Sequence, residues 1–241
     1  MKIAIISDIH GNMDAFEQVS ADIEKSRVDA VISLGDHIGY GPEPERVVAR
    51  IHQDKITAVQ GNHELALIEP EYLEWFNRAA RKSLNITRKL LTSKSIDFIK
   101  TLKRFYTAYG CRFVHGFPPD SVLTYLFQLP DEAKILALKK LSEQRCFIGH
   151  THTLDILSFG RQGFNGGQLK DGLNKLDKHR KYIISAGSVG QPRDGNNKAK
   201  YLIWDASEDT VEVRHIAYDI AAVVEKMMAA GLPQEHARRL W

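Results

Sequence analysis

The sequence predicts an α/β fold that begins with a parallel sheet covered by helices. Three observations indicate this fold class. Short runs rich in β-branched residues alternate with amphipathic helical segments, polar residues stand directly after several of these runs, and 43% of the 241 residues are hydrophobic. A chain of this length and composition can bury one complete core.

The first sixty residues alternate most clearly. Strands are expected at 2–7 (KIAIIS), 28–34 (VDAVISL) and 56–60 (ITAVQ). Asn12 is placed to cap a helix whose apolar face contains Phe16, Val19 and Ile23, and 44–52 (PERVVARIH) is the next helix. This βαβαβ opening favours parallel strand pairing.

The rest of the chain predicts a mostly helical stretch at 65–102 and then further strands. These strands are expected at 111–116, 145–149, 181–188, 200–206 and 210–217, with an amphipathic helix from Asp131. The Gly- and Asn-rich segment 164–178 is interpreted as a loop or hairpin, and no role is assigned to 155–181. A C-terminal amphipathic helix places 220, 223, 224, 227 and 228 on one apolar face and stops at Gly231 and Pro233. Because no repeat or low-complexity linker interrupts the chain, we expect a single domain over 1–241.

Charge and cysteine usage disfavour several classes of protein. The 33 basic residues nearly balance the 30 acidic ones, and no long basic block signals nucleic-acid binding. No apolar run is long enough to cross a bilayer and the first residues do not resemble a signal peptide, so a cytoplasmic protein without a membrane partner is expected. Cys111 and Cys146 lack C-x-x-C spacing. We interpret them as buried thiols in a reducing compartment, with a disulfide the weaker alternative.

Polar residues follow five of the predicted strands. In chain order they are Asp8-Ile9-His10, Gly35-Asp36, Gly61-Asn62-His63-Glu64, His115-Gly116 and Gly149-His150-Thr151-His152. The carboxyl ends of parallel strands line one crevice, so these side chains should converge. Asp, His and Asn offer oxygen and nitrogen ligands suited to divalent transition metals, and paired metals about 3.5–4 Å apart recur in phosphoester hydrolysis. A turn, a helix cap or a core histidine explains each piece alone, but together they contain five of the ten histidines and predict a metal centre.

This series resembles the motifs of the calcineurin-like metallophosphoesterase superfamily, from Asp8 to at least Arg193. The stretches GDHIGYGPEP, VHGFP and SAGSVGQPRDG resemble a bacterial and archaeal branch of small, single-domain, phosphodiesterase-like members. The resemblance implies two packed β-sheets flanked by helices, with the active site at the strand ends.

The resemblance also implies a binuclear centre and assigns its residues. The first metal would be held by Asp8, His10 and His152, the second by Asn62, His115 and His150, with Asp36 bridging both. His63 matches the catalytic histidine, which is not a ligand and can donate to the departing oxygen. The nucleophile would be a metal-bound hydroxide. Mn, Fe, Zn, Ni and Co all suit these ligands, and Mn is favoured.

The sequence departs from the phosphoprotein phosphatases of this superfamily. Their second motif continues with an Asp that pairs with the catalytic histidine and an Arg that grips phosphate, whereas Gly39 and Tyr40 stand here. The orienting partner of His63 is therefore unidentified, and His37 is interpreted as a spacer rather than a ligand. Tyr40 and Arg193 are candidate substrate contacts, for which the alternatives are a packing aromatic and a solvated loop cation.

Two classes of function follow. The favoured hypothesis is a phosphoesterase acting on a small phosphodiester or a nucleotide such as a dinucleoside polyphosphate; a phosphoprotein phosphatase is an alternative. The other class is a non-catalytic interaction scaffold on the same fold. Scaffold relatives lose the catalytic histidine or some ligands, whereas this sequence retains them all. The stretch 65–102 and the C-terminal helix are candidates for a homodimer contact, although an ordinary core explains them equally.

Overall fold

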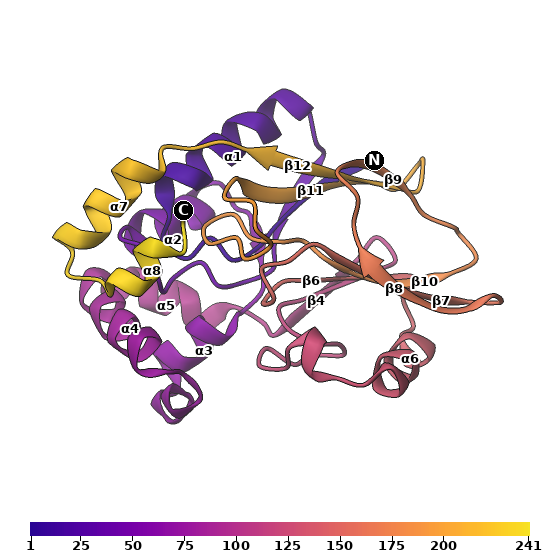
Figure 1. The fold of residues 1–241 in the computed structure, drawn as a ribbon, viewed down its shortest axis with the longest axis horizontal. Helices are drawn as coiled ribbons and strands as arrows, with labels where there is room; N and C mark the ends of the chain where they lie inside the picture. Colours follow the sequence, from indigo (N-terminus) through magenta and orange to yellow (C-terminus); the bar gives the residue numbers. More distant parts are fainter.

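The computed structural model describes all 241 residues as two six-stranded sheets packed face to face, with helices outside them (Figure 1). This four-layer arrangement is the architecture that the family resemblance implied. The local alternation alone predicted only an α/β domain with a parallel sheet.

The first sheet contains the βαβαβ opening. Its spatial order is β3 (Thr57–Ala58), β2 (Ala30–Ser33), β1 (Lys2–Ile6), β11 (Ala199–Asp205), β12 (Thr210–Ile216) and β9 (Gly172–Lys175). β1, β2 and β3 are parallel, as expected, and are connected by α1 (Met13–Ser26) and α2 (Pro44–Gln53). β11 pairs antiparallel with β1, placing Ile3 opposite Trp204. The sheet is therefore mixed.

The second sheet is built from later parts of the chain. Its order is β4 (Phe105–Ala108), β5 (Cys111–Val114), β6 (Arg145–Ile148), β10 (Lys181–Ser185), β7 (Asp155–Gly160) and β8 (Gly163–Gln168). β5, β6 and β10 are parallel neighbours, so the loops after β5 and β6 leave from the same edge. Those loops carry His115, His150 and His152.

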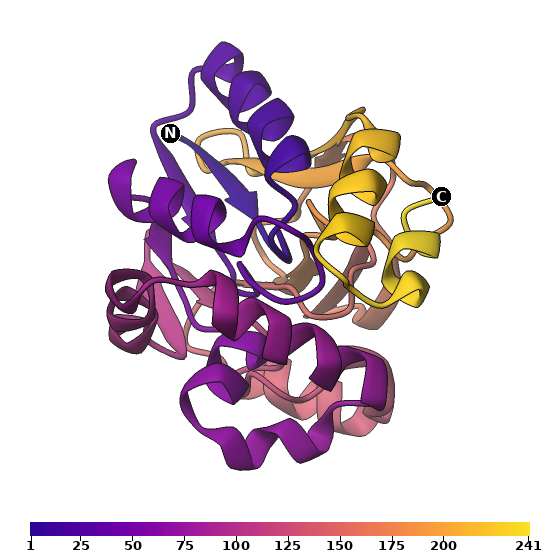
Figure 2. The same ribbon diagram turned by 90° about the vertical axis from the view of Figure 1, so that its left-hand side faces the viewer.

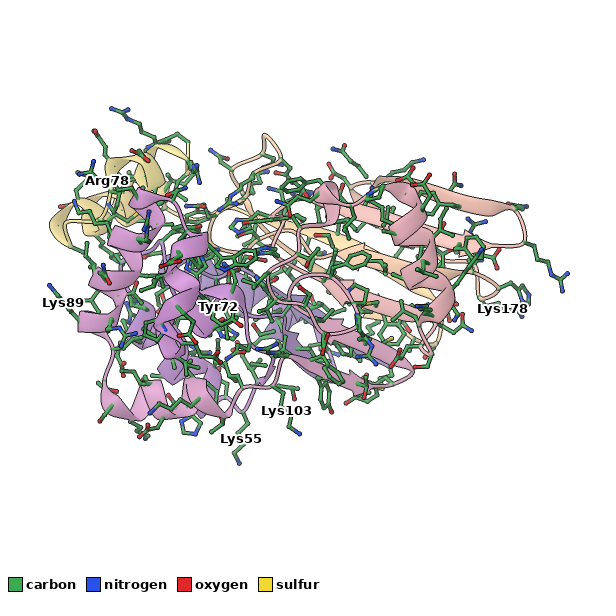
Figure 3. All side chains as sticks on the ribbon, turned by 90° about the horizontal axis from the view of Figure 1, so that it is seen from below. Lys55, Tyr72, Arg78, Lys89, Lys103 and Lys178 are labelled. Carbon is green, nitrogen blue, oxygen red and sulfur yellow. The ribbon has the colours of Figure 1, made fainter.

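The remaining helices cover the outer faces and one end of the molecule. They are α3 (Asn62–Ile68), η1 (Pro70–Trp75), α4 (Arg78–Leu90), α5 (Ser93–Thr101), η2 (Leu126–Gln128), α6 (Asp131–Lys140), α7 (Ile220–Ala229) and α8 (Gln234–Arg238). Figure 2 shows α7 and α8 gathered at the same end as α3, α4 and α5. Figure 3, a view from below, places Tyr72 of η1 near α4, whose two ends are marked by Arg78 and Lys89.

Alternation along β1 separates two cores. Ile3 and Ile5 point into a cluster between the sheets, whereas Ala4 and Ile6 pack with Phe16 of α1 on the outer face. This period of two is what a strand buried on both faces requires. Each fully buried Ile contributes roughly 1.5–3 kcal/mol relative to exposure, so both faces of β1 stabilise the sandwich.

The structure corrects several expectations. Segment 164–178 is not a hairpin, because β8 pairs with β7 in the second sheet and β9 pairs with β12 in the first. The strand β4 was absent from the expected order. The last predicted helix does end before Gly231. However, Pro233 does not end the helical region, because it is the N-cap of a further helix, α8. Met228 is 47% exposed and lies outside the apolar face assigned to it.

The two thiols are buried and free, as the spacing suggested. Burial raises the pKa of Cys111 to about 12, which keeps this thiol protonated. None of the helices combines the length and the apolar character needed to cross a bilayer.

Candidate metal centre

The loops after β1, β2, β5 and β6, together with the start of α3, bring the predicted site residues together. All are at most 6% exposed: Asp8, His10, Asp36, Asn62, His63, His115, His150 and His152. Their ligand atoms form three groups within 4.8 Å, which are Asp8 with His10 and His152, Asp36 with His115 and His150, and His10 with Asp36 and His63. The convergence expected from strand ends is present.

The backbone is strained at five of these residues. Their φ angles are positive: 54° at Asp8, 50° at His10, 53° at Asp36, 67° at His150 and 60° at His152. L-residues other than glycine seldom adopt this left-handed region, and such strained conformations cost of order 1–3 kcal/mol each. The strain is therefore concentrated at the candidate ligands.

Hydrogen bonds fix the tautomers of His10 and His152. The Nδ1–H of His10 donates to the Ile38 carbonyl at 2.9 Å, and that of His152 donates to the Gln191 carbonyl at 2.5 Å. Both Nε2 atoms then carry lone pairs, and they face each other at 3.1 Å. Two neutral acceptors at this distance repel, so the arrangement suits a cation bound by both.

Asp8 completes this group with one free oxygen. Its Oδ2 accepts hydrogen bonds from Ser7 Oγ at 2.5 Å and from the His150 backbone at 3.0 Å. Its buried Oδ1 has no hydrogen-bond partner and lies 3.2 Å from His152 Nε2. Burial alone would raise the pKa of Asp8, but the neighbouring histidines lower it well below its usual value. An ionised oxygen therefore points at the paired imidazoles.

The second group repeats the pattern. His115 donates through Nδ1 to the Leu34 carbonyl at 2.9 Å, and His150 donates through Nε2 to the Leu123 carbonyl at 3.2 Å. The remaining lone pairs, on His115 Nε2 and His150 Nδ1, are 3.2 Å apart. The Asn62 Oδ1 acceptor is 2.9 Å from the same His115 nitrogen. When both rings are neutral, three acceptors face one another here too.

Asp36 lies between the group of Asp8, His10 and His152 and the pair of His115 and His150. Its Oδ2 is 3.7 Å from His10 Nε2 and 3.4 Å from His115 Nε2. Its Oδ1 accepts from the His63 backbone N–H at 2.9 Å. The approach of this loop requires a glycine before Asn62, because a Cβ on Gly61 would fall 2.1 Å from Asp36 Oδ1. One carboxylate therefore reaches both groups.

The protonation states of His10 and His150 match those that bind metal, whereas His115 favours a positive charge. Burial and neighbouring histidines lower the pKa values of His10 and His150 well below the usual range. Burial would also lower the pKa of His115, but Asp36 and Asp8 raise it to about 9. Asp36 and Asp8 therefore stabilise a positive charge at His115. A divalent cation bound beside this ring would supply such a charge in place of the proton. The residues fit the two metal ions that the family resemblance implies.

His63 lies beside Asp36 without a hydrogen-bonded orienting group. Its Nε2 is 3.8 Å from Asp36 Oδ2, whereas its Nδ1 is buried and has no partner. A Cβ on Gly39 would lie 2.3 Å from that Nδ1, so position 39 faces the ring but offers no carboxylate. The ring is held instead by packing against Tyr40 and Phe76, with centroids 4.6 and 4.8 Å away.

Glu64 and His37 support the loops. Glu64 accepts backbone N–H groups of Asp36, His37 and Gly61, each at 2.8 Å, and so ties the β2 loop to the start of α3. His37 Nε2 contacts Ser33 Oγ at 2.8 Å and belongs to none of the three groups. Glu64 therefore caps both segments, and the interpretation of His37 as a spacer rather than a ligand agrees with this geometry.

Tyr40 and Arg193 both lie near the centre. The Tyr40 ring is 8% exposed, and its centroid is 4.5 Å from those of His10 and His236. The ring is thus enclosed and packs beneath the loop, which favours the packing alternative over stacking on a substrate base. The Arg193 guanidinium lies 5.7 Å from the Tyr40 centroid and donates to Gln191 Oε1 at 2.9 Å.

A cavity of about 120 Å³ adjoins the second group. It is lined by Tyr40, Asn62, Trp75, Phe76, Asn77, Ala80, Leu123, Tyr125 and His150. The sequence interpretation did not include Trp75, Phe76 or Tyr125. The aromatic clusters in EYLEWF and LTYLF were the signal that could have indicated them.

Comparison with known proteins gives consistent matches along the chain. Residues 1–209 match the model of the calcineurin-like phosphoesterase superfamily domain. The uncharacterized protein MJ0912 of Methanocaldococcus jannaschii is 32% identical over 99% of this chain and 97% of its own. A metallophosphoesterase from Sphaerobacter thermophilus is 32% identical with a TM-score of 0.86, covering 100% of this chain and 98% of that one. The hypothetical protein PH1004 from Pyrococcus horikoshii OT3, at 17% identity, shares the fold with a TM-score of 0.79 over 100% and 97% of the chains.

Proposed function

Because the chain belongs to the calcineurin-like phosphoesterase superfamily, we propose that it is a binuclear metal-dependent hydrolase of phosphodiesters or nucleotide polyphosphates. The observation that carries the proposal is the position of Asp36, whose Oδ2 lies 3.7 and 3.4 Å from imidazole nitrogens of two separate ligand groups. A single carboxylate that reaches both groups is suited to holding two cations.

The proposed ligand roles are those of the family, and two of the three groups together with the contact of Asn62 with His115 support them. Asp8, His10 and His152 would hold one ion, Asn62, His115 and His150 the other, and Asp36 both. When bound, two divalent ions supply Lewis acidity toward the phosphoryl oxygens and lower the pKa of a water nucleophile. The backbone carbonyls that accept from one nitrogen of each imidazole orient the ring so that its other nitrogen faces the site.

His63 would act on the departing oxygen. Its Nε2 faces Asp36, and it is positioned by ring packing rather than by a carboxylate. Burial lowers the pKa of His63, so a neutral N–H is the donor that it offers before substrate binds. A bound phosphate anion favours the protonated ring and so supports proton donation.

The surroundings favour a diester or anhydride over a phosphoprotein. Gly39 and Tyr40 stand where phosphoprotein phosphatases of this superfamily carry an Asp and a phosphate-gripping Arg. No Lys or Arg lines the cavity beside the centre. A phosphodiester carries less charge per phosphorus than a dianionic monoester, so it depends less on such a clamp.

The test compares kcat/KM on bis-p-nitrophenyl phosphate, a dinucleoside polyphosphate and a phosphopeptide, with Mn²⁺ present. We expect one of the first two to be preferred. A clear preference for the phosphopeptide would overturn the substrate class and leave the metal centre intact. No hydrolysis of any substrate by metal-loaded protein would favour the scaffold alternative.

A further inference from the structure

Trp75 combines exposure with a place in the wall of the cavity. It is 72% exposed, yet it lines the cavity together with Asn62 and His150. Its neighbours Tyr72, Leu73 and Phe76 pack into the cluster formed with α3, α4 and α5. The segment therefore packs these side chains at least partly against the core and leaves a tryptophan at the mouth.

A second segment adds aromatic rings to the same region. Tyr125, which also lines the cavity, stacks on His150 with centroids 3.7 Å apart and an interplanar angle of 17°. Phe127 stacks on Tyr125 at 5.0 Å and 29°, and is 70% exposed. A row of rings thus leads from a candidate ligand to the surface.

The size of the cavity decides what lies at its mouth. Its volume of about 120 Å³ can accommodate a phosphoryl group, whereas pockets that enclose a drug-sized ligand have volumes of roughly 300–1,000 Å³. The remainder of a larger substrate must extend past the mouth. There it meets exposed aromatic faces, and every nucleobase has a planar face that stacks on such a ring.

We propose that Trp75 is a specificity-determining residue that stacks on a base of a nucleotide substrate whose phosphate lies at the metal centre. This inference rests on the proposed function, since it places the phosphate there. Stacking suits the site because the cavity lining contains no charged side chain, so recognition of the organic group depends on shape and apolar contact. Tryptophan offers the largest aromatic face for this purpose.

Binding can be measured without turnover. The chain has three tryptophans, of which Trp204 is 4% exposed and Trp241, at 69%, matches Trp75 in exposure but does not line the cavity. With Zn²⁺ present, AMP should quench tryptophan emission saturably, whereas ribose 5-phosphate, which lacks the base, should not. We expect Trp75→Ala to lose this quenching and Trp241→Ala to retain it. Absence of saturable quenching in the wild type, or its persistence in Trp75→Ala, would overturn the proposal.

Kinetics separates this inference from the proposed function. Trp75→Ala should raise KM for a dinucleoside polyphosphate roughly tenfold, a typical effect of losing one base–aromatic contact. KM for glycerophosphoethanolamine, which has no ring, should not change, and Trp75→Phe should restore most of the nucleotide affinity. The wild type could fail to hydrolyse every substrate while AMP still quenches the emission of Trp75. In that case the proposed function fails and the stacking site stands. A normal KM for the nucleotide in Trp75→Ala would overturn the stacking role. If the variant then differs from the wild type only in its oligomeric state, Trp75 makes a protein contact instead.

Discussion

At the residue scale, the candidate centre is defined by where four imidazole protons point. His10, His115 and His152 donate through Nδ1 and His150 donates through Nε2, each to a backbone carbonyl. The motifs predicted these histidines, but they could not predict the tautomers. The acceptor of the His152 proton is 39 positions away and that of His115 is 81 away, so the choice of nitrogen depends on tertiary structure.

Replacing Asp36 should affect both ions. Because its Oδ2 lies between the two ligand groups, Asp36→Ala removes a ligand from each. Loss of a residue that only orients a ligand weakens metal binding by roughly 10–100-fold, so we expect at least that effect here for both sites. Elemental analysis and metal titration measure it. Wild-type occupancy together with wild-type hydrolysis in Asp36→Ala would refute the assignment.

His63 and His150 should separate catalysis from metal binding. His63→Ala is expected to keep metal occupancy near wild type and to lower kcat by roughly 10²-fold, the contribution of a general acid. His150→Ala removes a nitrogen that faces His115 at 3.2 Å and should release or weaken one ion. Metal content and kcat are measured on both variants. Equal metal loss in the two would mean that His63 is itself a ligand, which its place in the group with His10 and Asp36 permits.

At the scale of elements, the positions of strand ends were more predictable than the sheet to which each strand belongs. The β-rich runs before Asp8, Asp36 and Asn62 gave β1, β2 and β3 in the expected parallel order. The segment 164–178 could not be placed, because its glycines signal a turn equally well within a hairpin or between two sheets. Its two strands pair with partners in different sheets, and only the tertiary structure decides this.

The helix α8 adds a buried histidine that the sequence interpretation did not anticipate. Pro233 was interpreted as a terminator, but proline at a helix start has no N–H to leave unsatisfied. The helix places His236 against Tyr40, with centroids 4.5 Å apart, and both His236 nitrogens are buried without hydrogen-bond partners. This element lies outside residues 1–209, the part that matches the family model.

Burial of His236 should make stability depend on pH. Burial lowers the pKa of His236 to about 4, from an ordinary value near 6.5. Below pH 6.5 the unfolded chain binds a proton at this residue that the folded protein excludes, so stability falls as the pH drops toward 4. His236→Phe retains an aromatic ring and removes the titration. The difference in unfolding free energy, wild type minus variant, should therefore decrease between pH 7 and pH 4. A pH-independent difference would show that His236 takes up its proton in the folded state.

At the scale of the whole molecule, the two-sheet architecture could not be read from local patterns. Alternation identifies strands but not the sheet to which each belongs, and the pairing of Ile3 with Trp204 joins opposite ends of the chain. The family resemblance supplied the sandwich, and the structure agrees with it. Two of the three ligand groups show why this matters, because each of them combines side chains that follow strands of both sheets, whereas His10, Asp36 and His63 all follow strands of the first sheet. Asp8 and His10 follow β1 whereas His152 follows β6, and Asp36 follows β2 whereas His115 follows β5.

Metal removal should therefore destabilise the whole fold. Each ion would connect loops of the two sheets and lie beside Asp8 and Asp36, whose carboxylates have only histidines as ion-pair partners. A ligand at 100 times its Kd stabilises the folded state by about 2.7 kcal/mol, so two ions give about 5 kcal/mol and, for a chain of this size, roughly 10–20 °C in Tm. We expect EDTA to lower the Tm of metal-loaded wild type by this amount and to leave Asp36→Ala almost unchanged. An equal shift in both proteins would mean that the chelator acts elsewhere. No shift in a wild type shown to have lost its metal would mean that the ions do not hold the sheets together.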